Sequence, residues 1–325
     1  MMVSAAVLAI VLAALVVPVQ VTAQAAARLS SLEMHPLKSV TLSEAQFLTG
    51  ARDGAPAVIA AELRLPRPTG RLPAVVLLHG SSGVRANSDR WAREFNDIGV
   101  AAFVVDSFTG RGITSTAADQ AQLDSVVMII DAYRALEMLA RHPRIDPARI
   151  ALMGFSKGGF ATLYSSMKRF RRLYGPSDAE FAAYFTFYGT CQKRFLEDED
   201  VADRPIRLFH GTADDWLPIE PCRRYVARLQ KAGKDVTLTE YPGALHAFDA
   251  HYLPPRLSVP AVQTGPTCDL AERSPGQMMN VRTGQPFSIK DPCIERGATV
   301  GYDPGAHQKA LKAVTEILSA VFKLN

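Results

Sequence analysis

The stretch "RIALMGFSKGG", residues 149–159, decides the fold of this chain. Its first half is a run of apolar residues that predicts a buried β-strand, and a serine flanked by glycines, Ser156, follows directly. The pattern Gly-x-Ser-x-Gly places a serine on a sharp turn when a strand precedes it and a helix follows it. Because five residues can match by chance, the rest of the sequence must supply that context.

Strand-like and helical stretches alternate along most of the chain. Apolar runs that predict buried strands lie at 73–80, 100–108, 149–155, 181–189, 204–211 and 235–243. Apolar residues at helical spacing predict helices at 88–99, 117–142, 157–170, 218–234 and 305–322. This alternation predicts an α/β fold with a mostly parallel central sheet and helices on both faces. The context that Ser156 requires is therefore present.

The composition is that of an ordinary globular protein. Of 325 residues, 48% are hydrophobic and 21% are charged, which allows a sizeable core. The net charge of +4 is small and both signs are interspersed, so we do not expect a nucleic-acid-binding protein. The one dense basic run, at 168–172, falls where a predicted helix ends, and the helix dipole favours cations there.

The N-terminal segment is apolar and carries no charged side chain through residue 25. An apolar run at 3–17 ends at Pro18 and small residues follow, an order typical of a cleavable signal peptide at 1–25. The run lacks a preceding Lys or Arg and is close to the shortest length that spans a bilayer, so an uncleaved anchor is the alternative. We expect an exported protein, periplasmic or secreted, that contacts a membrane only if this segment is retained.

Residues 26–325 are expected to form a single domain with a Pro- and Gly-rich excursion at about 251–302 that lacks periodicity. The four cysteines lack the paired spacing of a zinc site. In an oxidising compartment they favour two disulfides, and proximity in sequence favours the pairs Cys191–Cys222 and Cys268–Cys293. The second pair would staple the excursion, and free buried thiols are the alternative.

A serine hydroxyl becomes a nucleophile when a histidine removes its proton and a carboxylate orients that histidine. In α/β folds with this serine turn, the acid follows the serine and the histidine comes last. The loop after the predicted strand 204–211 offers Asp214 and Asp215, between which the residues alone do not decide. His246 follows the last predicted strand and is the expected base, whereas His307 opens the closing helix and is expected to face solvent.

Backbone N–H groups would hold the oxyanion of an acyl-transfer reaction. One is expected from Lys157, directly after the serine, and the other from the loop "HGSSG" at 79–83, where Ser81 is favoured. The glycines of this loop allow close approach to a substrate. The side chain of Lys157 lies at a helix N-terminus, which disfavours a cation, so we expect it in solvent rather than on an anionic substrate.

Five motifs together resemble the dienelactone hydrolase family of the α/β-hydrolase fold: "LLHGSSG", "VVDSFTGRGI", "IALMGFSKGG", "GTADDWLP" and "YPGALHAFD". The resemblance runs from about residue 73 to residue 246, and the closing helix also matches. The family's acid motif is a glycine, an aspartate three residues later and a proline four residues after that. It selects Asp214 and not its neighbour. The resemblance also implies His246 as the histidine and the amides of Ser81 and Lys157 as the oxyanion donors.

Two positions depart from the best-known members of that family. Those members have a cysteine nucleophile where this chain has Ser156, and a glutamate where it has Gly80. A hydrolase is still implied, but the dienelactone substrate does not follow. Arg111, in "SFTGRGI", has two interpretations: it meets a substrate carboxylate, or it braces its loop against the sheet.

The sequence thus predicts an exported serine hydrolase that cleaves an ester or lactone through an acyl-enzyme intermediate. The predicted triad is Ser156, His246 and Asp214. A small-molecule substrate is the expected partner, no metal or dissociable cofactor is required, and the oligomeric state is not predicted. Two alternatives are a peptidase or acyltransferase on the same scaffold, and a catalytically silent binding protein.

Overall fold

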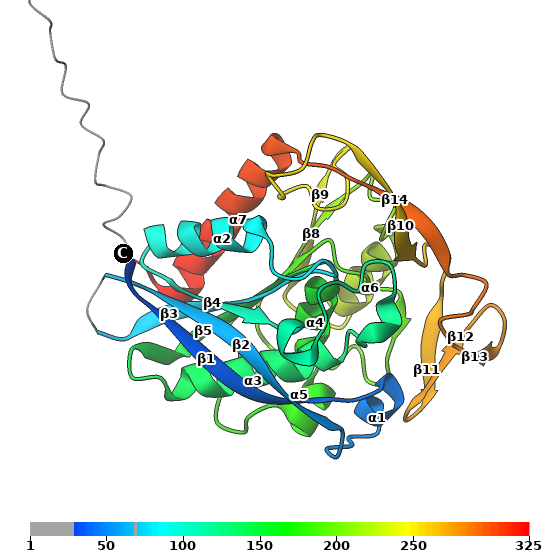
Figure 1. Cartoon of the computed structure of the whole chain (residues 1–325), viewed down its shortest axis with the longest axis horizontal. Coiled ribbons are helices and arrows are strands. Elements are labelled where there is room, and N and C mark those ends of the chain that lie inside the picture. The colour runs from blue at the N-terminus through cyan, green and yellow to red at the C-terminus, as the bar shows by residue number, and fades with distance from the viewer. Residues whose placement is uncertain (1–28, 68–69, 325) are drawn as a thin grey trace, which may run out of the picture.

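A computed structural model describes residues 29–67 and 70–324, so the expected signal peptide lies outside the described residues. The central sheet consists of β1 (Leu29–Thr41), β2 (Ala55–Pro66), β3 (Leu72–Leu78), β4 (Ala101–Asp106), β5 (Ile145–Phe155), β6 (Tyr184–Phe187), β8 (Ile206–Gly211) and β9 (Val236–Tyr241). Their order is β1-β2-β4-β3-β5-β6-β8-β9 (Figure 1). β2 pairs antiparallel with β1 and β4, and every pair from β4 to β9 is parallel. The predicted α/β fold with a mostly parallel sheet is confirmed.

The helices are α1 (Glu44–Leu48), α2 (Ala86–Asp97), α3 (Val127–Arg141), α4 (Lys157–Ser165), α5 (Lys168–Tyr174), α6 (Glu220–Lys231) and α7 (Pro304–Phe322). Two of them differ from the expected spans. α3 begins ten residues late, after a loop with a short 3₁₀ turn at Gln120–Gln122. The helix expected at 157–170 is broken because Ser165 and Ser166 return hydrogen bonds to carbonyls of α4, and Met167 adopts an extended conformation.

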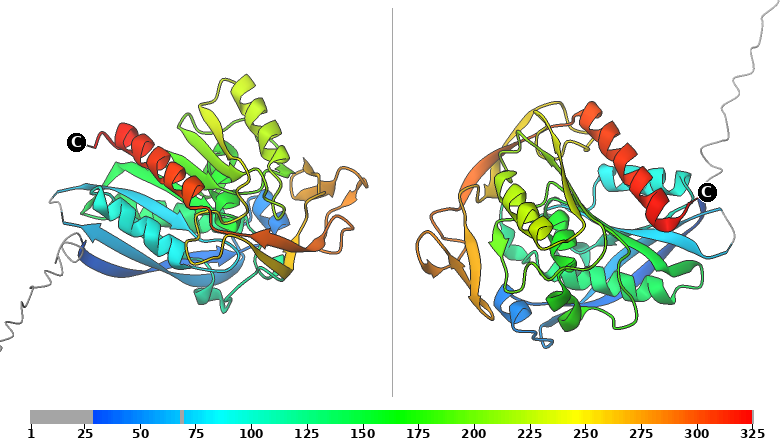
Figure 2. Two further views of the ribbon diagram at one scale, coloured as in Figure 1. Left: turned by 90° about the horizontal axis from the view of Figure 1, so that it is seen from above. Right: turned by 180° about the vertical axis from the view of Figure 1, so that it is seen from behind.

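Two apolar layers sandwich the sheet, and the alternation of side chains along β3 shows how they form. Ala74, Val76 and Leu78 face the layer that contains α3, α4, α5 and α6, whereas Val75 and Leu77 face α2 and α7. All five side chains are fully buried, as expected for a strand covered on both faces. Figure 2 shows α2 and α7 side by side on one face. The sheet is therefore packed on both faces, and its carboxyl edge carries the loops of the candidate site.

The first antiparallel strand pair was not predicted. β1 and β2 pair over most of their length and extend the sheet beyond β4. The sequence of β1 does not show the usual strand pattern of apolar residues inside and polar residues outside, because large apolar side chains such as Leu32 and Met34 point outward and are exposed. Its inward residues, including Leu37, pack against α3 and the core.

The excursion at 251–302 is ordered and contains short strands that its sequence did not suggest. These are β10 (Leu257–Thr264), β11 (Leu270–Ser274), β12 (Gln277–Asn280), β13 (Gln285–Pro286) and β14 (Glu295–Val300). β10 pairs with β14, and the other three form a small sheet with β7 (Lys193–Arg194). Their periodicity is weak because they are short and carry register shifts. In Figure 1, β11, β12 and β13 lie in the orange lobe at the side of the main fold.

One disulfide closes the excursion internally, and an ion pair holds it against the main fold. Both expected disulfides are present: Cys268–Cys293 lies within the excursion, and Cys191–Cys222 ties the segment after β6 to α6. Arg169, from the basic run, is buried on Glu272 of β11 with N–O distances of 2.5 and 2.8 Å. The basic run therefore includes a structural anchor at the start of α5, and not only a solvated helix end. Among the residues that the structure places, no helix is long and apolar enough to cross a membrane.

Candidate active site

Ser156 lies on a tight turn between β5 and α4. Its backbone has φ 53° and ψ −112°, a conformation that side chains rarely adopt, and its N–H donates to the carbonyl of Phe187 at 2.9 Å. The neighbouring glycines are required for space. A Cβ at Gly158 would lie 2.4 Å from the carbonyl oxygen of Leu78, and one at Gly154 would lie 2.2 Å from the carbonyl oxygen of Gly158. The turn expected from the quoted stretch is thus observed.

The loops after three parallel strands bring together the serine, the histidine and the acid. His246 Nε2 lies 3.0 Å from Ser156 Oγ, and His246 Nδ1 lies 2.8 Å from Asp214 Oδ2. All three residues are buried, with 2–8% of each surface exposed. These distances allow proton transfer from the hydroxyl to the imidazole.

Asp214 is held as a carboxylate. Its Oδ1 accepts the N–H groups of Trp216 and Leu217 at 3.0 and 2.8 Å, and Oδ2 lies 3.2 Å from His210 Nε2. Burial acts to raise the pKa of Asp214, but the charge of His246 and the hydrogen bonds of both histidines outweigh it and hold the pKa well below its usual range. Asp215, the alternative acid, is exposed and accepts the N–H of Thr299 at 2.7 Å.

Two aromatic rings that sequence reasoning missed hold the imidazole of His246. The ring centre of Tyr188 lies 4.7 Å from that of His246, and the ring centre of Trp216 lies 4.8 Å from it. The Tyr188 hydroxyl donates to the buried carboxylate of Asp249 at 2.5 Å. Tyr188 also has a positive φ of 36°. This strained backbone next to the serine turn is the structural feature that identifies Tyr188 as part of the site.

The two amides expected to bind an oxyanion lie beside the serine. A Cβ at Gly80 would lie 3.3 Å from the Cβ of Ser156, so the loop that carries Ser81 approaches the serine closely. Within the residues that the structure describes, the Ser81 amide has no hydrogen-bond acceptor. Lys157 is the first residue of α4, where an N–H has no intrahelical acceptor. Both donors are therefore available to a ligand.

The side chain of Lys157 is not in solvent, contrary to expectation. It is 5% exposed, and its Nζ donates to Gln120 Oε1 at 3.0 Å. Burial lowers the pKa of Lys157 to about 7, against an opposing effect of the nearby Asp124 carboxylate. The expectation failed because it considered only the helix N-terminus, whereas the loop that contains Gln120 and the excursion cover the side chain.

Arg111 lies apart from the triad. Its guanidinium forms a bidentate pair with the buried carboxylate of Asp131, at 2.8 and 2.9 Å, and donates to the carbonyl of Ser107 and the hydroxyl of Thr41. Only 4% of its side chain is exposed. These contacts brace the loop after β4 against α3 and β1, and they leave the guanidinium no route to a substrate.

His307 is a second correction, because it is buried rather than in solvent. It is 2% exposed and its ring packs at 5.8 Å from that of Trp91 in α2. Neither ring nitrogen has a hydrogen-bond partner among the described residues, and burial lowers its pKa. The closing helix turns its N-terminus toward α2, which a helical period alone does not reveal.

One group of potential metal ligands occurs in the described part of the chain, outside the triad. Atoms of Glu33, His35 and His142 lie within 4.8 Å of one another. His142 Nδ1 accepts the N–H of Arg144 at 3.2 Å, so the proton of the neutral ring is on Nε2 and points to Glu33. In that tautomer Nε2 donates to Glu33, and the three side chains form a hydrogen-bonded cluster in which His35 Nε2 also lies 3.1 Å from Glu33 Oε2.

Comparisons with known proteins identify the family of this chain. The model of the dienelactone hydrolase family matches residues 59–322. The chain is 29% identical over 148 residues to the uncharacterized peptidase YuxL of Bacillus subtilis, covering 38% of this chain and 22% of that protein. It is 27% identical over 209 residues to a Bradyrhizobium protein described as a "probable 2-oxo-3-(5-oxofuran-2-ylidene)propanoate lactonase", covering 59% and 79%.

A solved structure shares the fold. The dienelactone hydrolase-like promiscuous phosphotriesterase P91 from metagenomic libraries superposes with a TM-score of 0.56 at 17% identity, covering 90% of this chain and 99% of that one. The family match spans most of the chain, including every residue of the candidate site. The chain therefore belongs to the dienelactone hydrolase family, α/β hydrolases that act on ester bonds.

Proposed function

We propose that this protein is an exported serine hydrolase that cleaves an ester or lactone through a Ser156–His246–Asp214 triad. The observation that carries the proposal is the continuous pair of contacts from Ser156 Oγ to His246 and from His246 to Asp214, at 3.0 and 2.8 Å. Family membership supports the ester chemistry, and the two disulfides are compatible with export.

In the proposed reaction, Ser156 Oγ attacks the ester carbonyl while His246 Nε2 takes the hydroxyl proton. The carbonyl π electrons move to oxygen, and the amides of Ser81 and Lys157 stabilise this oxyanion. The intermediate collapses, the carbon–oxygen bond to the alcohol breaks, and His246 returns the proton to the leaving oxygen. Water, deprotonated by His246, then attacks the acyl carbon, the bond to Ser156 Oγ breaks, and His246 returns the proton to Oγ as the acid is released. Asp214 stays ionised throughout and stabilises the imidazolium.

A peptidase is the second candidate, and the match to YuxL is the observation that favours it. The same triad can attack an amide. An amine is more basic than an alcohol and leaves only after His246 has protonated it, and a peptide substrate needs longer binding subsites. Hydrolysis of p-nitrophenyl acetate without cleavage of the corresponding acetyl p-nitroanilide assigns ester chemistry. Cleavage of both at comparable kcat/KM assigns peptidase chemistry.

Labelling with a fluorescent fluorophosphonate tests the triad. The wild type is expected to label, and Ser156→Ala is expected to lose labelling and ester hydrolysis together. Ser177→Ala is the matched control, because Ser177 is an exposed serine that does not line the pockets beside Ser156. A folded wild type that neither labels nor hydrolyses esters would contradict the proposal and favour a silent binding protein.

A further inference from the structure

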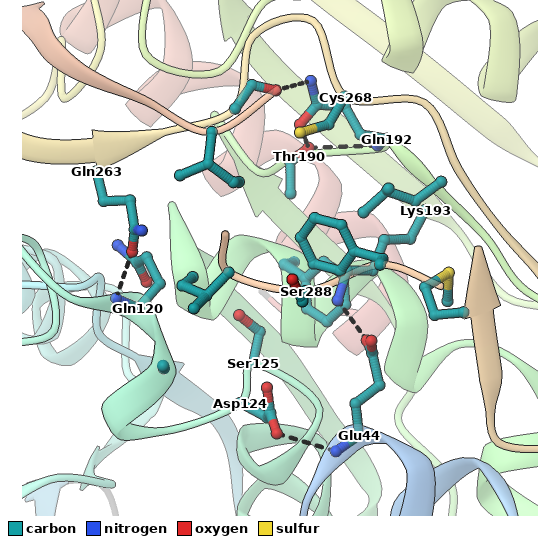
Figure 3. A pocket seen from close by; sticks show the side chains of 18 of the residues that line it. Glu44, Gln120, Asp124, Ser125, Thr190, Gln192, Lys193, Gln263, Cys268 and Ser288 are labelled. Carbon is teal, nitrogen blue, oxygen red and sulfur yellow. Dashed lines mark hydrogen bonds and ion pairs between the residues drawn. The ribbon is translucent and has the colours of Figure 1, made fainter. Parts of the chain in front are cut away.

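Two pockets meet at Ser156. The larger has a volume of about 510 Å³ and extends to the small sheet of the excursion, and the smaller, of about 300 Å³, extends toward β10. Ser81, Ser156 and Trp216 line both pockets, so the serine stands at their boundary. Figure 3 shows the larger pocket, with Gln120 and Gln263 on one side and Lys193 on the other.

The two pockets lie on different sides of the proposed triad. His246 lines the smaller pocket and not the larger, whereas Lys157 lines the larger and not the smaller. The alcohol oxygen receives its proton from His246 Nε2, so it must come within hydrogen-bond distance of that nitrogen. The alcohol part of an ester therefore enters the smaller pocket. The acyl part, which remains on Ser156, extends into the larger one.

We infer that the larger pocket is the acyl site and selects a bulky, mainly apolar acyl group that carries one uncharged oxygen acceptor, while the smaller pocket takes an apolar alcohol. The inference rests on the proposed function, because it uses His246 as the proton donor to the leaving alcohol.

The walls of the larger pocket are mostly apolar. Phe160 and Phe287 face it, together with aliphatic side chains of the excursion. Lys193 is neutralised by an ion pair with Glu44, and its Nζ lies 5.7 and 5.9 Å from the centres of the two phenyl rings. These paired charges leave a site for a ring or branched hydrocarbon of considerable size.

One polar group of this pocket, the amine of Lys157, has a single hydrogen-bond partner among the described residues. Lys157 Nζ donates to Gln120, and no carboxylate of the described residues lies within ion-pair distance of it. Gln120 also bonds the hydroxyl of Ser81, so this donor lies at the serine end of the pocket. At least one N–H group of this amine remains for an acceptor on the acyl group. Because the Asp124 carboxylate also lines the pocket, a hydroxyl or keto oxygen is favoured over a carboxylate.

Two isomeric esters test which pocket takes which part. Methyl 3-phenylpropanoate has its bulk in the acyl group, and 2-phenylethyl acetate has the same bulk in the alcohol. Ile289 at the larger pocket and Leu257 at the smaller are matched positions, 39% and 42% exposed, so tryptophan is tolerated at either. Ile289→Trp is expected to lower kcat/KM tenfold or more for the methyl ester and less than threefold for the acetate. Leu257→Trp is expected to do the reverse.

The outcomes separate the pocket assignment from the proposed function. The opposite pattern, or equal effects of each variant on both esters, overturns the assignment while fluorophosphonate labelling and hydrolysis persist. Loss of labelling and hydrolysis in the wild type overturns the proposed function itself.

Lys157→Met tests the oxygen acceptor. The ratio of kcat/KM for methyl 2-hydroxy-3-phenylpropanoate to that for methyl 3-phenylpropanoate should fall about fivefold, as expected for one lost hydrogen bond. Using the ratio removes any common effect of the substitution on folding or on the serine turn. An unchanged ratio would show that Lys157 does not donate a hydrogen bond to the oxygen of the acyl group.

Discussion

Replacing Asp214 by asparagine should disable the proposed base without disturbing the fold. Asp214 Oδ1 accepts two backbone N–H groups, from Trp216 and Leu217, and an amide nitrogen in that place would face both donors. The asparagine therefore keeps its oxygen there and turns its NH₂ toward His246 Nδ1. That ring nitrogen must then accept a hydrogen bond, so the imidazole proton moves to Nε2, 3.0 Å from Ser156 Oγ.

A protonated Nε2 cannot accept the serine proton. In serine hydrolases with a triad this tautomer exchange lowers kcat by about 10⁴-fold, or roughly 5.5 kcal/mol at 1.36 kcal/mol per factor of ten. Loss of one ordinary hydrogen bond accounts for only about 1 kcal/mol. We expect Asp214→Asn to reduce kcat by about 10³- to 10⁴-fold and to change KM less than about threefold, because the substrate pockets are untouched.

Steady-state hydrolysis of p-nitrophenyl acetate measures this effect, with circular dichroism to verify the fold. Asp215→Asn is the control, because Asp215 is the exposed neighbour that accepts the Thr299 N–H. Its kcat should stay within about twofold of the wild type, as usual for exposed polar changes. Equal losses in the two variants, or an Asp214→Asn enzyme within tenfold of the wild type, would refute the tautomer argument.

Three further measurements address the surroundings of the triad. Arg111→Met should lower the free energy of unfolding in urea by about 3–5 kcal/mol by stranding the Asp131 carboxylate, with kcat unchanged; a raised KM at unchanged stability would instead indicate substrate binding. The lowered pKa of Lys157, about 7, means that between pH 7 and about 10 the unfolded chain binds a proton that the folded chain does not. Stability should therefore rise with pH in this window by up to about 1.4 kcal/mol per unit, and Lys157→Met should remove that slope. Replacing Cys268 and Cys293 by serine should cost about 3.5 kcal/mol of unfolding free energy for a loop closed at a separation of 25, and undiminished stability would contradict it.

The serine turn and the convergence of Ser156, His246 and Asp214 could be predicted because they depend on local sequence and on the order of residues along the chain. Consecutive residues around Ser156 form a strand, a glycine-bounded turn and a helix. The acid and the histidine are constrained to follow it after particular strands. The choice of Asp214 over Asp215 needed the resemblance to a family, because both residues occupy the same loop and only the folded chain turns one inward.

The surroundings of the site depend on contacts between distant residues and could not be predicted. Lys157 is covered by Gln120, 37 residues earlier, and Arg111 is held by residues of β1 about 70 positions away. His307 is buried by α2, more than 200 residues before it. A period of 3.6 residues identifies an amphipathic helix but does not say which neighbour covers its end.

Ile289 and Leu257, at the rims of the two pockets, both belong to the excursion, which supplies none of the three triad residues. The rims of both pockets thus include a stretch of the polypeptide that is separate from the proposed triad. Exchanging residues 251–302 between relatives, disulfide included, is a route to new ester preferences in which the reaction chemistry and the main sheet remain as inherited.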